Sequence, residues 1–104
     1  MSTLKITTLT CVRKQDIADD DEPVIYIAGL RVWDGKMGKG DSVHPNVSRT
    51  FSDSVLLELK EQNNNKSEKS LGKWTIEDTR TASNNAPLTA TSSGYHYRVY
   101  YDVV

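Results

Sequence analysis

The sequence of 104 residues has little cysteine and proline, no basic surplus and no long apolar run. Cys11 is the only cysteine, so no disulfide can form within the chain, and its setting predicts a small buried side chain. Thirteen basic residues stand against fourteen acidic ones, and this net charge of -1 argues against nucleic acid as the main partner.

No stretch approaches the roughly 18 apolar residues of a membrane span. The opening residues, MSTLKITTLT, lack the basic and apolar regions of a signal peptide. We therefore expect neither a membrane span nor a signal peptide in this chain. The sequence does not fix the compartment, and secretion as part of a longer protein is one of the options. The length fits one domain, residues 1–104, with a single lean core.

Most of the sequence consists of short segments with alternating apolar and polar residues, separated by turn residues. We expect strands at residues 4–13, 24–33, 54–60, 71–76, 88–91 and 95–103, and an edge strand within 42–50, which contains Pro45. In the first strand, Leu4, Ile6, Thr8, Thr10 and Val12 are expected on one face. The last strand is expected to bury Tyr95, Tyr97, Val99, Tyr101 and Val103. With no helical pattern, the sequence predicts an all-β antiparallel sandwich of about seven or eight strands.

Residues 14–27, KQDIADDDEPVIYI, combine a dense acidic run with an abrupt switch into an apolar strand at Pro23. The run places five carboxylates within seven residues: Asp16, Asp19, Asp20, Asp21 and Glu22. Like charges this close repel one another. Two explanations for their gathering stay open: screening by bulk solvent, or a hard cation such as calcium, which prefers oxygen ligands.

The order of these features resembles the C2-type calcium- and lipid-binding sandwich, in particular the C2-like modules at the ends of bacterial proteins. The resemblance is carried by Asp21-Glu22-Pro23 leading into a Val/Ile/Tyr strand, the Gly-rich connection after Trp33, Val55-x-Leu57-x-Leu59, Leu71-Gly72 and the Tyr-rich closing strand. It implies calcium held at one end between two acidic loops, the second beginning at Glu61. The implied ligands are Asp16, Asp19, Asp20, Asp21, Glu22, Glu61, Asn63 and Glu68.

A second calcium motif competes with this interpretation. Asn63-Asn64-Asn65-Lys66-Ser67 resembles most of a βγ-crystallin calcium site, although only one copy is present. Lys36, Met37 and Lys39 form a further candidate group, for contact with anionic lipid headgroups with Met37 inserted. Two lysines alone attract such a surface only weakly.

Catalysis has little support in the sequence. No Gly-x-Ser-x-Gly nucleophile elbow is present, and His44 and His96 lack further ligands for a transition metal. We expect His96 in a surface or cross-strand role, and Trp33 and Trp74 in core or rim packing.

The sequence thus predicts a non-enzymatic calcium-binding module that docks to anionic lipid or to a protein partner through its end loops. Two alternatives stay open. One is a structural or adhesive domain of a larger secreted or toxin-like protein, without a functional metal site. The other is a sugar-binding sandwich, for which an exposed Trp33 or Trp74 next to polar loops is the feature to find.

Overall fold

A computed structural model describes residues 1–13, 21–62, 67–78, 87–92 and 94–104 of the chain. These residues form nine strands: β1 (Ser2–Arg13), β2 (Pro23–Ile27), β3 (Leu30–Asp34), β4 (Ser42–Val43), β5 (Val47–Phe51), β6 (Ser54–Gln62), β7 (Glu68–Glu77), β8 (Leu88–Ser92) and β9 (Tyr95–Val103). No helix in this part of the chain is long and apolar enough to cross a membrane.

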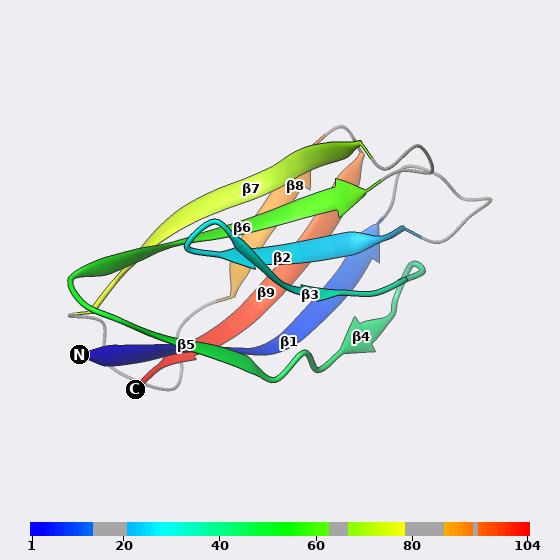
Figure 1. The fold of residues 1–104 in the computed structure, drawn as a ribbon. Helices are drawn as coiled ribbons and strands as arrows, with labels where there is room; N and C mark the ends of the chain where they lie inside the picture. The colour runs from blue at the N-terminus through cyan, green and yellow to red at the C-terminus, as the bar shows by residue number, and fades with distance from the viewer. Residues whose placement is uncertain (14–20, 63–66, 79–86, 93) are drawn as a thin grey trace.

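The strands build two antiparallel sheets that pack face to face (Figure 1). In the five-stranded sheet, β4 and β5 both pair with β1 at one edge, and β9 and β8 follow. The other sheet has the order β3-β2-β6-β7. The predicted all-β antiparallel sandwich is therefore confirmed.

Two predicted strands are each broken into two. Residues 24–33, predicted as one strand, form a hairpin, because Ala28 and Gly29 take φ values of 55° and 78°. Positive φ at both central residues belongs to the tight turn that matches the twist of paired strands. Residues 42–50 break around Pro45, where Asn46 has a φ of 52°. The predicted edge position of this region is confirmed, since β4 and β5 pair only with β1.

The core lies between the sheets and follows the predicted alternation in β6 and β9. Val55, Leu57 and Leu59 are buried in β6, and the five predicted residues of β9 are buried. Trp33 and Trp74 are half-buried and pack against this core, as predicted. Neither tryptophan is fully exposed, and the sugar-binding alternative stays a prediction.

The predicted facing of β1 holds only for its first half. Leu4 and Ile6 are fully buried, but a bulge at Thr7 inserts one extra residue opposite β9. Leu9 and Cys11 then face the core, whereas Thr8, Thr10 and Val12 do not. The prediction for those three residues was wrong because a bulge reverses the alternation beyond it. The predicted burial of Cys11 is confirmed.

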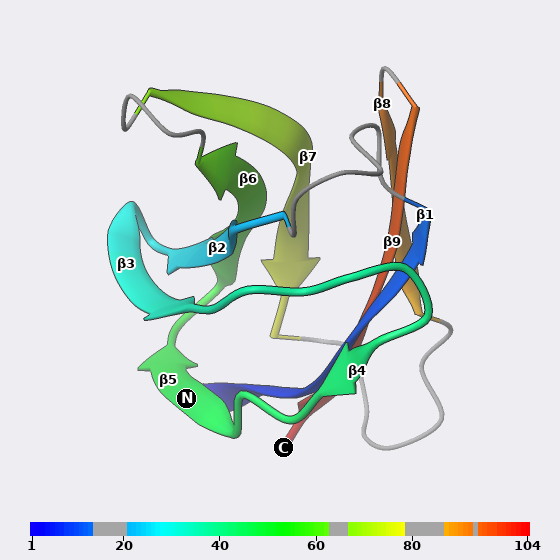
Figure 2. The ribbon, with the colours of Figure 1, turned by 90° about the vertical axis from the view of Figure 1, so that its right-hand side faces the viewer.

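The connection from β3 to β4, residues 35–41, runs from one sheet to the other (Figure 2). Asp21 and Met37 exchange two backbone hydrogen bonds of 2.9 Å, and Gly40 N donates to Cys11 O at 2.8 Å. The connection is thereby tied to both sheets. Met37 is 0% exposed within the core, so the predicted insertion of this side chain into a membrane is wrong.

Candidate functional site

Two separate parts of the chain that carry acidic residues lie at the end of the sandwich where β1 and β6 finish (Figure 1). Asp21 and Glu22 directly precede β2, and Glu61 lies opposite Pro23 in the pairing of β6 with β2. Gln62 N donates a 3.0 Å hydrogen bond to Glu22 O, which fixes this register. We call Asp21, Glu22 and Glu61 the acidic end.

Asp21 is the innermost member of the acidic end, with 3% of its surface exposed. Its Oδ2 accepts a 2.6 Å hydrogen bond from the hydroxyl of Tyr97, which β9 points inward. Burial raises the pKa of Tyr97 far above its ordinary value, and the hydrogen bond to Asp21 and the neighbouring Cys11 thiol raise it further. Tyr97 therefore stays a neutral donor that compensates the buried carboxylate.

The ionised form of Glu61 is disfavoured by its surroundings. Burial raises the pKa of Glu61, and the negative charges of Asp21 and then Glu22 raise it further, while Lys69 opposes them. Lys69 lies opposite Glu61 in register, with its Nζ 5.8 Å from the ring centroid of Tyr95. Among the described groups, Glu61 thus lies close enough to Asp21 and Glu22 to be repelled by both, and Lys69 is the one cation that opposes this repulsion.

Glu68 starts β7 at the same end but is held in a different network. Its Oε1 accepts a 2.5 Å hydrogen bond from the hydroxyl of Tyr26, which raises the pKa of Tyr26. Glu68 lies opposite Gln62, the residue after Glu61, so strand alternation turns Glu68 to the outward face of the sheet. Gln62 there accepts a 3.0 Å hydrogen bond from Arg31, which also pairs with Asp34.

The remaining predicted ligands, Asp16, Asp19, Asp20 and Asn63, lie outside the described residues, as does most of the βγ-crystallin-like motif. Within the described ranges, no group of three or more His, Cys, Asp and Glu side chains is arranged to hold a metal ion. The described carboxylates thus do not form a complete site by themselves. The predictions for the other four residues stay predictions.

The two histidines lie apart on the five-stranded sheet. His44 Nδ1 lies 3.2 Å from Thr8 Oγ1, whereas His96 pairs in register with Arg13 and Thr91 at the acidic end of the sheet. His96 is half-buried, and the predicted surface or cross-strand role of this residue stays a prediction. Tyr97 and Lys69 were not predicted as parts of the site, although a tyrosine at an inward position signals a hydroxyl that needs a buried partner.

Comparison of the sequence with protein-family models and with curated proteins gives no match to either. The residues and their geometry are therefore the basis for the function proposed below.

Proposed function

We propose that this protein is a non-enzymatic, C2-like binding module that takes up calcium at its acidic end. The strand register that brings Asp21, Glu22 and Glu61 to one end carries the proposal, and their mutual repulsion, which helps to raise the pKa of Glu61, agrees with it. A bound divalent cation relieves that repulsion, and carboxylates are the ligands that calcium prefers.

The neighbouring sequence supports a cation rather than a lone carboxylate pair. Asp19 and Asp20 directly precede Asp21, and Asp16 and Asn63 belong to the two stretches that flank the acidic end. These residues supply the oxygens that the described carboxylates lack for six to eight ligands. Asp21 contributes mainly charge, because its Oδ2 is engaged by Tyr97.

Calcium uptake gives this end a simple mode of action. Without the cation the end repels anionic surfaces, and with it the same end attracts them. The partner is then an anionic lipid surface or an acidic patch on another protein. The lysines at positions 36 and 39 are exposed and add to that attraction, without membrane insertion of Met37.

The test is a calcium titration followed by thermal unfolding, with magnesium as the control cation. Binding to the folded state adds about 2.7 kcal/mol of stability at a hundredfold excess of calcium over the Kd. We expect Glu61→Gln and the double variant Asp19→Asn, Asp20→Asn to lose this gain. Glu77→Gln, at the far end of β7 opposite Ser54, should keep it. Absence of any shift at millimolar calcium contradicts the proposal.

A structural or adhesive domain without a metal is the second candidate. It is favoured by the Tyr97–Asp21 and Tyr26–Glu68 hydrogen bonds, which satisfy two of the carboxylates within the protein. Retention on vesicles that contain phosphatidylserine separates the candidates. A calcium-dependent module is retained only with calcium, whereas a structural domain is not retained under either condition.

A further inference from the structure

The outward face of the five-stranded sheet is rich in hydroxyl groups. Strand alternation turns Thr8 and Thr10 of β1 outward, beside Ser42 and His44. Thr10 Oγ1 lies 2.8 Å from Ser42 Oγ, and Thr8 Oγ1 lies 3.2 Å from His44 Nδ1. Thr89 and Thr91 of β8 continue the same face, with Tyr100 of β9 between them and β1. We call this surface the hydroxyl face.

The hydroxyl face also carries cations without carboxylate partners. Arg98 faces outward between the buried Tyr97 and Val99, and within the described ranges it has no ion pair. Lys5 and Arg13 face outward on β1, and Asp102 lies opposite Lys5 without forming an ion pair.

The outward face of the other sheet differs in this respect. There Arg31 pairs with Asp34 at 3.0 Å, and Lys60 and Lys73 each lie 4.0 Å from Glu58. These cations are paired within the protein, whereas Lys5, Arg13 and Arg98 form no ion pair with any other described residue.

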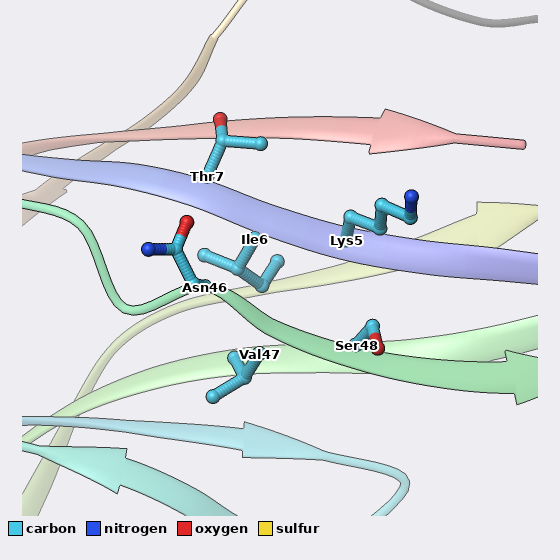
Figure 3. A pocket seen from close by; sticks show the side chains of 6 residues that line it. All are labelled: Lys5, Ile6, Thr7, Asn46, Val47 and Ser48. Atoms are coloured by element: carbon cyan, nitrogen blue, oxygen red, sulfur yellow. The ribbon is translucent and has the colours of Figure 1, made fainter.

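A hollow of about 230 Å³ lies where the bulge of β1 meets the start of β5 (Figure 3). It is lined by Lys5, Ile6, Thr7, Asn46, Val47 and Ser48. The side chains of Lys5, Thr7, Asn46 and Ser48 offer an ammonium, an amide and two hydroxyls on the outward side, whereas Ile6 and Val47 point to the core (Figure 3). The volume is below that of ordinary small-molecule sites, so the hollow suits one charged group of a larger ligand.

We infer that the hydroxyl face binds an acidic polysaccharide, a chain of hydroxyl-bearing sugars with carboxylates at intervals. One carboxylate lies in the hollow at Lys5, and a second pairs with Arg98, whose guanidinium offers two parallel donors. Thr10 lies opposite Arg98, and the five residue steps from Lys5 to Thr10 span about 16 Å of strand. The threonines, His44 and Tyr100 lie between and contact the intervening sugars.

The balance of groups favours this ligand over other anions. Nucleic acid carries one charge per phosphate and needs a dense set of cations, which this face lacks. A membrane surface calls for exposed apolar anchors, but among the described residues Met1 and Val104 lie at the chain ends, away from Arg98, and Leu30 and Leu56 belong to the other sheet. The hydroxyl face has few cations and many hydroxyl groups, and an acidic polysaccharide likewise has few charges and many hydroxyl groups.

The test is affinity electrophoresis of the full chain through gels that contain polygalacturonate, with EDTA present so that calcium plays no part. Retardation by polygalacturonate and not by neutral dextran is the expected result. Lys5→Gln with Arg98→Gln should weaken binding at least about tenfold, because two charge-assisted contacts are lost. The matched control, Lys39→Gln with Lys73→Gln, removes the same charge elsewhere and should bind as the unmodified protein does.

Several outcomes overturn the inference. They are equal retardation by dextran, equal weakening by the control pair, or no retardation by polygalacturonate. Binding to phosphatidylserine vesicles in EDTA without binding to polygalacturonate assigns the face to lipid instead. Because EDTA is present throughout, failure here leaves the calcium proposal untouched, and failure of the calcium titration leaves this inference untouched.

Discussion

At the scale of single residues, the buried carboxylate of Asp21 depends on the Tyr97 hydroxyl at 2.6 Å. Tyr97→Phe removes that donor and keeps the ring in the core. We expect a loss of about 2 kcal/mol in the free energy of unfolding, since a buried charged group loses a hydrogen bond. Urea unfolding measures it. Tyr100→Phe, on the outward side of the same strand, is the control, with an expected change within about 0.5 kcal/mol.

Glu61 gives a prediction that depends on pH. Its pKa in the folded protein is raised above the ordinary 4.5, so its ionised form destabilises the fold at pH above the folded pKa. That cost disappears as pH falls through the folded pKa. Glu61→Gln should therefore stabilise the calcium-free protein at pH 7, by less than about 1 kcal/mol because the group is partly exposed. The gain should vanish below pH 4.5, and a gain that persists at acidic pH contradicts this origin.

At the scale of elements, the hairpin of β2 and β3 contains a strained residue. Ala28 has a φ of 55°. This left-handed conformation costs conformational energy for a residue with a Cβ, and the cost is smaller for asparagine. Ala28→Asn creates the Asn-Gly pair that this turn favours, and we expect a gain of about 0.5–1 kcal/mol. Ala28→Val should destabilise, because a β-branched side chain fits this conformation poorly. Thermal unfolding of both variants measures the effect. If the two variants are equally stable, strain at residue 28 is not the cause.

Alternation alone predicts β6 and β9, because their apolar residues recur without interruption and one face is buried along the whole strand. It fails where the backbone departs from a regular strand. The bulge at Thr7 reverses the facing of Thr8 and Thr10, and Ala28–Gly29 turns the chain inside a continuous apolar run. No local pattern marks either position strongly.

The candidate site divides along similar lines. The clustering of carboxylates around Asp21 and Glu61 at one end follows from the order of strands and loops. The hydrogen bonds from Tyr97 to Asp21 and from Tyr26 to Glu68 could not be predicted in this way, because only the tertiary fold brings these tyrosines near the carboxylates. Met37 was predicted at a lipid surface because its neighbours are glycine and lysine, yet its two backbone bonds to Asp21 seat it in the core.

At the scale of the whole molecule, the two proposed sites lie in different parts of the sandwich. Asp21, Glu22 and Glu61 lie at one end of the sandwich, and Lys5 and Arg98, which form no ion pair within the described ranges, lie on the outward face of the five-stranded sheet. The chain termini meet at the other end, where Thr3 and Val104 exchange backbone hydrogen bonds of 2.8 and 3.0 Å. Both proposed sites are therefore independent of each other and can be tested in one protein.

The most direct test of the calcium proposal is a titration of the ¹⁵N-labelled protein with calcium, followed by amide NMR spectra. The proposal predicts saturable shifts concentrated at Glu22, Glu61 and the connection at 35–41, which Asp21 ties to this end. Magnesium at the same concentration should shift these amides less. Spectra that stay unchanged at millimolar calcium, or that change only at the opposite end near Thr3 and Val104, contradict a calcium site at the acidic end.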